Sequence, residues 1–125
     1  MKTLTLFLAL ALPTFAADTI ITGKVVGVHD GDTLTLRTED ETLKVRLSGI
    51  DTPELGQPFG NNAKQALSAV AFGKTATIKS SGKDRYGRTL GYIFIEDQAI
   101  NTMMVRMGMA WLSLIHISEP TRQFR

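Results

Sequence analysis

The sequence predicts a mainly β fold of the α+β class, because apolar and polar residues alternate with a period of two along several segments and helical spacing is confined to two others. At 125 residues the chain has room for one domain with a modest core. It shows no internal repeat, linker or low-complexity tract. We therefore expect a single domain to contain any functional site.

The first three strands are predicted to form an antiparallel meander. Residues 20–28 are rich in β-branched side chains, and Gly23 and Gly27 indicate bends or bulges in a strongly curved strand. An Asp-Gly turn at residues 30–31 leads into a second strand over residues 33–38. After an exposed acidic tip, the third strand returns with apolar residues at every second position: Leu43, Val45 and Leu47.

A helix is expected after the meander. Prolines and glycines mark residues 53–60 as a loop, after which Asn61 or Asn62 is expected to cap the helix, and Gly73 follows its end. Small and aliphatic residues form its apolar stripe: Ala63, Ala66, Leu67 and Val70. Because this stripe is narrow, the helix should pack closely on the sheet.

Two strands and a short helix complete the predicted domain. The strands cover residues 75–79 and 89–95, and a polar loop over residues 80–88 joins them. Asn101 is expected to cap the helix, which ends at Gly108 and contributes methionines to the core: Met103, Met104 and Met107. Three meander strands, a helix and two strands are the element order of the five-stranded Greek-key barrel known as the OB fold.

The N-terminal segment has the layout of a secretory signal peptide. Lys2 precedes an apolar run over residues 4–12, and small residues lead to a cleavage site that we place after Ala16. The run is too short to span a bilayer, so we expect no membrane attachment once residues 1–16 are removed. The mature protein is expected to be exported, to a bacterial periplasm or the exterior. The absence of cysteine excludes disulfides and thiolate metal sites.

The C-terminal segment 112–125 resembles the translation of a transposase adapter ligated to DNA in sequencing libraries. The eleven residues Leu112 to Arg122 back-translate into successive codons of such an adapter. The rival interpretation, an amphipathic strand or helix ending at Pro120, has little periodicity in its favour. We therefore expect a native domain over residues 17–111 whose gene continues past Trp111, and we discount His116 as a ligand.

The charge balance changes once both terminal segments are set aside. The full chain carries a formal net charge of +2, but the residues from 17 to 111 contain eleven basic and eleven acidic side chains. Overall charge therefore gives no reason to expect nucleic-acid binding. Local charge does, because four basic residues surround Asp84 in the predicted loop and phosphate contact depends on the local field: Lys79, Lys83, Arg85 and Arg88.

Five charged residues together suit metal-assisted phosphodiester chemistry. Asp32 and Asp51 could ligate a hard cation, Glu54 could transfer a proton, and Arg46 and Arg88 could bind a phosphate. Each residue alone is more often structural, as a turn former or a solvated side chain. The predicted hairpin changes this weighting, because it returns the end of the third strand beside the start of the second and so brings the two aspartates together. Without a cation, two converging carboxylates would repel.

These residues lie in three motifs that resemble the staphylococcal-nuclease-like (thermonuclease) family. The resemblance spans about residues 20–111 and rests on the combination of the motifs Asp30-Gly31-Asp32-Thr33, Arg46-Leu47-Ser48-Gly49-Ile50-Asp51-Thr52-Pro53-Glu54 and Asp84-Arg85-Tyr86-Gly87-Arg88-Thr89-Leu90-Gly91-Tyr92. It implies an OB-fold barrel and Ca²⁺-dependent cleavage of DNA and RNA that leaves a 3′-phosphate and a 5′-hydroxyl. It also implies a last helix after Trp111, which we expect to be missing here.

The resemblance implies a role for each site residue. Asp32 and Asp51 would ligate Ca²⁺ together with the Thr52 carbonyl, Asp30 would act on the metal shell from farther away, and Glu54 would be the general base. On the phosphate side, Arg46 and Arg88 would bind the scissile phosphate and Tyr86 a nucleotide phosphate. Arg85 belongs to the same basic loop and is expected to bind substrate through its charge.

Because none of these residues is expected to contact base edges, we predict little sequence preference. We also expect the protein to be a monomer. Two alternatives remain: a noncatalytic OB-fold module that binds nucleic acid, and a truncated chain that is inactive because it does not fold stably.

Overall fold

The structure, a computed structural model, describes residues 18–113. The predicted signal peptide and nearly all of the predicted adapter-derived tail lie outside the described residues. Within residues 18–113 there is no helix whose length and hydropathy would allow it to span a membrane.

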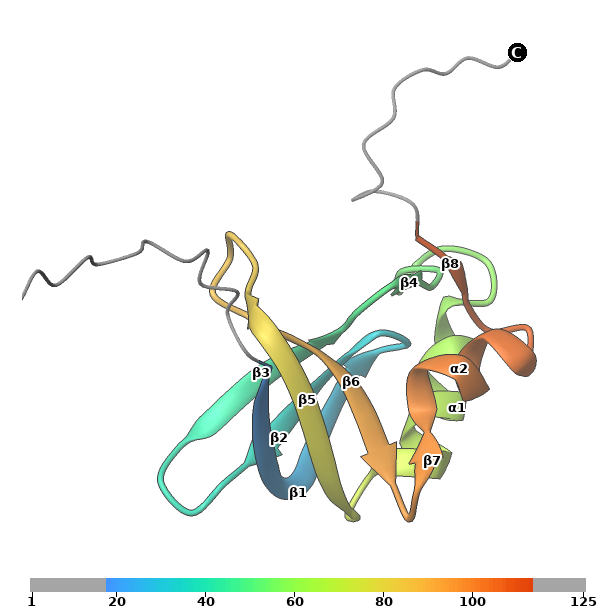
Figure 1. Ribbon diagram of the computed structural model, residues 1–125. Coiled ribbons are helices and arrows are strands. Elements are labelled where there is room, and N and C mark those ends of the chain that lie inside the picture. Colours follow the sequence, from blue (N-terminus) through green and yellow to red (C-terminus); the bar gives the residue numbers. More distant parts are fainter. Residues whose placement is uncertain (1–17, 114–125) are drawn as a thin grey trace, which may run out of the picture.

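Five strands form a closed barrel, which confirms the predicted fold class (Figure 1). β1 (Thr19–Asp30), β2 (Thr33–Arg37) and β3 (Thr42–Leu47) form the antiparallel meander, while β5 (Thr75–Lys83) pairs with β1 and with β6 (Thr89–Ile95). Parallel pairing of β3 with β6 closes the barrel. This last pairing joins segments more than forty positions apart, so it determines which residues of the two halves of the chain meet.

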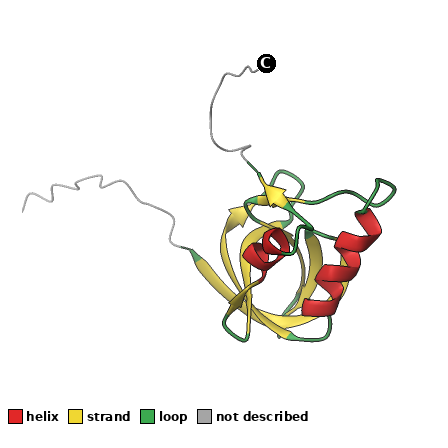
Figure 2. Ribbon diagram, turned by 90° about the vertical axis from the view of Figure 1, so that its right-hand side faces the viewer, coloured by secondary structure: helices red, strands yellow, loops and turns green. Residues whose placement is uncertain are grey.

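Two helices and three two-residue strands complete the described fold. α1 (Gly60–Ala71) contacts β1, and α2 (Ile100–Arg106) contacts β6 and α1. Figure 2 shows both helices on the same side of the barrel. β7 (Gln98–Ala99) pairs with β6, and β4 (Ile50–Asp51) pairs with β8 (Trp111–Leu112). The sequence analysis missed these short strands, because two residues are too few to show a period.

Alternation along the strands supplies most of the core. Inward-facing strand residues pack against Leu67 of α1 and Met104 of α2, both fully buried. The other fully buried large side chains come from β1, β2, β3, β5, β6 and the first turn of α2: Val25, Leu34, Leu36, Val45, Leu47, Ile78, Ile93 and Ile100. The expected core role of the methionines holds for Met104 and for the partly buried Met103, but Met107 is 40% exposed.

The glycines of β1 act as predicted. A register shift between Val25 and Gly27 marks a bulge, and a second shift follows between Val28 and Asp30. At Gly23 the backbone approaches the neighbouring strand so closely that a Cβ atom would lie 2.5 Å from the Arg37 carbonyl oxygen. Only glycine allows β1 to curve this tightly against β2.

The predicted cap of α1 is wrong. The helix begins at Gly60, and Phe59 occupies the N-cap position with a left-handed backbone and no side-chain cap, so neither Asn61 nor Asn62 caps it. The Gly60 N–H instead donates to the Gln57 carbonyl at 3.0 Å. A Cβ at Gly60 would collide with the Glu54 backbone, so this close-packed turn places the N-cap at Phe59, two residues before Asn61.

The predicted cap of α2 is also wrong, since the N-cap residue is Ala99. Asn101 lies within the first turn, is 4% exposed, and hydrogen-bonds three backbone groups outside its helix. Its amide nitrogen donates to the carbonyls of Ser48 at 2.8 Å and Gly91 at 3.2 Å, and its amide oxygen accepts from the Ile93 N–H at 2.9 Å. Asn101 therefore does not cap α2 but links α2 to β6 and to the turn after β3 through buried hydrogen bonds.

The polar loop predicted over residues 80–88 is shorter in the structure, because β5 continues to Lys83. A register shift between Ser80 and Gly82 lets the strand continue to pair with β6 despite its polar sequence. Gly82 there has φ of 146°, which glycine adopts without strain. The true loop is therefore Asp84 to Arg88, a compact turn rather than a flexible connection.

Candidate active site

Asp32 lies in the tight turn between β1 and β2, where it is buried. Its backbone N–H donates to the Asp30 carboxylate at 3.1 Å. Its own carboxylate accepts from the Thr33 hydroxyl and from the Thr52 N–H, both at 3.2 Å. A Cβ on Gly31 would lie 2.8 Å from the Thr52 hydroxyl and 2.6 Å from Ala63, so glycine at this position lets the turn pack against both.

Arg46 joins the two aspartates that the hairpin was expected to bring together. Its Nη2 lies 2.6 Å from Asp51 Oδ1 and 3.4 Å from Asp32 Oδ2. Its Nη1 donates to the carbonyls of Leu47 at 2.6 Å and Ile50 at 2.9 Å. The two carboxylate oxygens can therefore be no farther apart than the sum of the two Nη2 distances. Their mutual repulsion is offset by a guanidinium that four contacts hold in place.

Burial, with a smaller contribution from its hydrogen-bonded neighbour Asp30, raises the pKa of Asp32 to about 6. The charge of Arg46 and the Thr52 N–H act in the opposite direction, but they do not compensate for the lost solvation. Asp32 is thus a carboxylate whose ionised form is costly in the absence of further positive charge.

The chemistry of this donor set fits a hard cation. Two carboxylates converge, and the buried Thr52 hydroxyl beside Asp32 has no hydrogen-bond partner. The described residues hold no group of three or more His, Cys, Asp or Glu side chains able to bind a metal. A cation here would therefore need backbone carbonyls and water in addition to Asp32 and Asp51, which Ca²⁺ accepts.

The loop between β5 and β6 is organised by one carboxylate. Asp84 Oδ1 accepts from the backbone N–H groups of Tyr86 and Arg88, both at 2.9 Å, and its Oδ2 accepts from the Arg88 Nε at 2.7 Å. Burial alone would raise the pKa of Asp84, but the Arg88 backbone and side chain and the Tyr86 N–H together lower it below its ordinary value. Because Asp84 engages the Nε of Arg88, the rest of that guanidinium is oriented by this bond.

Tyr86 lies between two cations of this loop. The guanidinium carbons of Arg85 and Arg88 lie 5.3 and 5.4 Å from the centre of its ring. The ring remains 70% exposed, so it is accessible to a ligand although both arginines lie near it.

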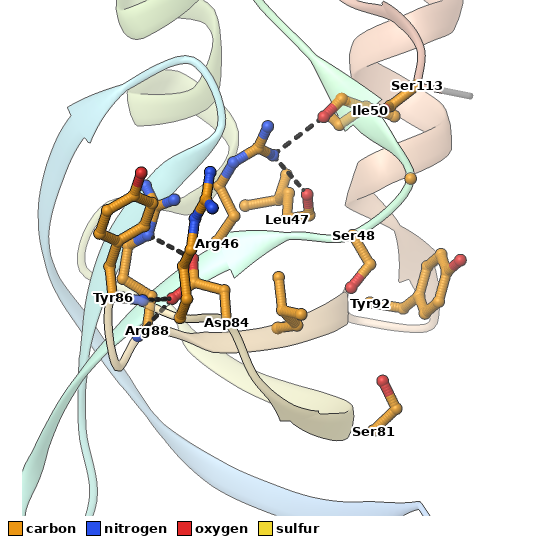
Figure 3. Close-up of a pocket in the computed structure, with 13 residues that line it drawn as sticks. Arg46, Leu47, Ser48, Ile50, Ser81, Asp84, Tyr86, Arg88, Tyr92 and Ser113 are labelled. Atoms are coloured by element: carbon orange, nitrogen blue, oxygen red, sulfur yellow. Dashed lines mark hydrogen bonds and ion pairs between the residues drawn. The ribbon is translucent and has the colours of Figure 1, made fainter. Parts of the chain in front are cut away.

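A cavity of about 560 Å³ connects the two regions, and Arg46 and Arg88 both line it. In Figure 3, Arg46 lies between Ile50 on one side and the cluster of Asp84, Tyr86 and Arg88 on the other. Parallel pairing explains this arrangement, because Arg46 of β3 is the register partner of Leu90 of β6. The structure therefore brings both predicted phosphate-binding arginines to one cavity.

Glu54 is the predicted site residue that the structure does not connect to the others. It is exposed, and its backbone forms a local turn with Gln57, whose side chain accepts from the Glu54 N–H at 2.7 Å. Among residues 18–113, no hydrogen bond or ion pair joins the Glu54 carboxylate to another side chain. Its role as general base stays a prediction.

Sequence reasoning missed two residues that shape this site. Asn101 fixes the turn after β3 through the Ser48 carbonyl, as described above, and Tyr92 lines the cavity against Gly49. For Asn101 a signal was present, since it lies three positions before the buried Met104 and so on the same face of the helix. For Tyr92 the only signal was its position in the alternating pattern of β6, which does not distinguish a site residue from any other strand residue.

Comparison with known proteins agrees with this architecture. The family model for staphylococcal nuclease homologues matches residues 44–124. An uncharacterized endonuclease of Haemophilus influenzae is 46% identical over 100 residues, which are 79% of this chain and 56% of that protein. A micrococcal nuclease of Shigella flexneri is 41% identical over 98 residues, or 71% of this chain and 56% of the relative. An uncharacterized endonuclease of Escherichia coli O157:H7 is 37% identical over 109 residues, which are 86% of this chain and 70% of that protein.

The chain belongs to the staphylococcal nuclease family. The family match includes Arg46, Asp51 and the whole loop from Asp84 to Arg88, whereas Asp32 precedes it in the chain. The chain spans little more than half the length of the first two relatives, 56% in each case. Family membership and the barrel are thus established.

Proposed function

We propose that this protein is an exported, Ca²⁺-dependent nuclease that hydrolyses DNA and RNA with little sequence preference and leaves 3′-phosphate ends. One observation carries the proposal: Arg46 contacts both Asp32 and Asp51 and also lines the cavity that Arg88 lines from the loop between β5 and β6. Two guanidiniums for a phosphate thus line a single cavity, and one of them contacts both carboxylates for a cation.

The arrangement suggests a division of labour for phosphodiester hydrolysis. Asp32, Asp51 and the Thr52 carbonyl would hold Ca²⁺, which when bound supplies positive charge for the phosphate oxygens. Arg88, whose Nε is bonded to Asp84, keeps two terminal nitrogens that can bond two phosphate oxygens. Both terminal nitrogens of Arg46 already contact protein oxygens, so Arg46 would offer its Nε and its charge, and both guanidiniums would offset the charge that develops during attack. Glu54 would take a proton from the attacking water, which requires its loop to bring the carboxylate toward the phosphate.

The test is digestion of single-stranded DNA by the purified chain in the presence of Ca²⁺. We expect fragments with 3′-phosphate ends, and we expect cleavage to stop on addition of a Ca²⁺ chelator and resume with excess Ca²⁺. Asp51→Asn should require far more Ca²⁺, whereas Asp97→Asn, a carboxylate next to β7 and outside the cavity, should not. Cleavage that continues unchanged in chelator would exclude the metal role.

The isolated position of Glu54 favours one other function, that of a noncatalytic module that binds nucleic acid. Glu54→Gln distinguishes the two. For a nuclease, this change should lower kcat on the order of 10² or more while the affinity for oligonucleotides remains. Tight binding by the unmodified chain without any turnover would instead support the binding module.

Export and a monomeric state belong to the same proposal. Lys2, the apolar run and Ala16 support cleavage of a signal peptide before Ala17. Expression in a bacterial host and N-terminal sequencing of the periplasmic fraction should give Ala17 as the first residue. Size-exclusion chromatography with light scattering should give one chain per particle.

A further inference from the structure

The chain contains a single tryptophan, and the structure places it beside the candidate metal-binding carboxylate. Trp111 of β8 is the antiparallel register partner of Asp51 in β4. Directly opposed residues of an antiparallel pair project from the same face, with Cβ atoms about 5 Å apart. The Asp51 side chain on this face reaches Arg46 at 2.6 Å, so the Trp111 indole lies on the same side of β4 as the carboxylate cluster.

The indole is unusually open for a residue of this size. It is 53% exposed, and it is not among the residues that line the cavity shared by Arg46, Tyr86 and Arg88. Its strand lies beside β4, and Figure 3 shows Arg46 between Ile50 of β4 and the cluster with Tyr86 and Arg88. Trp111 therefore adjoins the carboxylate that contacts Arg46 from the β4 side, whereas Tyr86 belongs to the cluster on the other side of Arg46.

This geometry has a consequence for any substrate with nucleotides on both sides of the reacting phosphate. With the phosphate at Arg46 and Arg88, one nucleotide is directed toward the exposed ring of Tyr86. On the side of β4 and β8 the other nucleotide would meet the exposed ring of Trp111, and Tyr92, which lines the cavity itself, is 49% exposed. Bases stack on aromatic rings without sequence preference, which suits a site that does not contact base edges.

We propose that Trp111 is a substrate-positioning residue that stacks on the nucleobase across the scissile phosphate from Tyr86. The inference rests on the proposed nuclease function and adds a base site at Trp111 to it. Tyr86 and Trp111 would then hold the two nucleotides at either end, which orients the phosphate between them relative to Arg46. Substrates with a base on both sides should be preferred over substrates with one.

The experiment uses two substrates that contain one phosphodiester bond and a single base, one with the base on the 5′ side and one with it on the 3′ side, together with the two-base dinucleotide. Trp111→Ala should raise KM on the order of tenfold for the dinucleotide and for one single-base substrate, and less than twofold for the other. Tyr86→Ala should show the reverse selectivity. Trp111→Phe should restore most of the affinity because it keeps a ring.

Leu112→Ala is the matched control. Leu112 is 67% exposed on the same two-residue strand but projects from the other face, so its truncation should leave KM for all three substrates unchanged. Equal losses from both strand variants would show that β8 is only structural. An unchanged KM in Trp111→Ala, or the same substrate selectivity in Tyr86→Ala, would overturn the proposal while cleavage by the unmodified chain leaves the nuclease function intact.

Tryptophan fluorescence separates failure of this inference from failure of the proposed function. Because Trp111 is the sole tryptophan, stopped-flow mixing reports on its surroundings before turnover. The dinucleotide should quench the emission, whereas the substrate without a base on the Trp111 side should not. If the unmodified chain cleaves nothing, quenching by the dinucleotide still supports the base site, and absence of quenching rejects it.

Discussion

The two halves of the candidate site are built in different ways. The carboxylate half combines Asp32, in the turn between β1 and β2, with Arg46 and Asp51 on paired strands, and the Arg46 side chain is only 17% exposed. The phosphate half is a five-residue loop from Asp84 to Arg88 whose central ring is 70% exposed. The first half is held by the barrel, and the second is held by the bonds of one carboxylate, Asp84.

The pKa values of the two central carboxyl groups, Asp32 and Asp84, shift in opposite directions. Burial makes ionisation of Asp32 costly and raises its pKa, whereas the donors around Asp84 lower its pKa. The carboxylate half therefore costs stability in exchange for a concentrated negative charge. The phosphate half gains stability from its charge but depends on a short exposed turn to aim Arg88.

The strongest test of the comparison is to remove Arg46. Arg46→Met leaves two converging carboxylates without their guanidinium, and removal of one partner from a largely buried ion pair costs about 3 kcal/mol of unfolding free energy. Arg88→Met, the matched change in the exposed loop, should cost less than about 1 kcal/mol. Both values follow from urea denaturation monitored by circular dichroism in metal-free buffer. Equal losses of unfolding free energy in the two variants would mean that the two arginines contribute equally to stability, which would contradict the comparison.

The next effect concerns rate rather than stability. Arg88→Lys keeps the charge but loses the planar donor pair and the bond to Asp84, so kcat on single-stranded DNA should fall on the order of 10². Arg85→Lys is the control, because Arg85 makes no hydrogen bond in the described loop and should lose less than about tenfold. Full activity in Arg88→Lys would remove Arg88 from the phosphate site.

A smaller effect sharpens the role of burial at Asp32. Its folded pKa is raised to about 6 from 3.8, so between these values the folded state holds a proton that the unfolded state has lost. Stability from this group is therefore lost as the pH rises through that window. Without metal, Asp32→Asn should become more stable relative to wild type between pH 4 and 7, by about 2 kcal/mol. Parallel pH curves for the two proteins would contradict this account.

The smallest effect is expected at Asp84, with the opposite sign. Because its folded pKa is lowered, its contribution is fully present above the ordinary aspartate pKa and is lost as the pH falls through the lower folded value. Asp84→Asn should cost less than about 1 kcal/mol at pH 7, and this difference should vanish at strongly acidic pH. Thermal unfolding of Asp32→Asn, Asp84→Asn and the wild type at a series of pH values measures both pH dependences in one experiment.

Much of the fold could be predicted from local sequence patterns. The wrong predictions share one cause, which is that tertiary contacts overrode a local preference. The meander, α1 and β6 followed from alternation, helical spacing and terminal glycines, because these signals reside in adjacent residues. Asn61, Asn62 and Asn101 were assigned as caps by propensity, but a close approach at Gly60 and the buried bonds of Asn101 overrode it. The two-residue strands β4 and β8 had no local signal at all.

By itself the sequence determined the barrel class, the three charged motifs and the convergence of Asp32 with Asp51, since a hairpin is a local structure whose register its own strands define. Only the tertiary structure decided that Arg46 and Arg88 share a cavity, because the parallel pairing of β3 with β6 joins distant segments. The same holds for Trp111 beside Asp51. Pairings across long stretches of chain depend on how the whole core packs, and no local pattern contains that information.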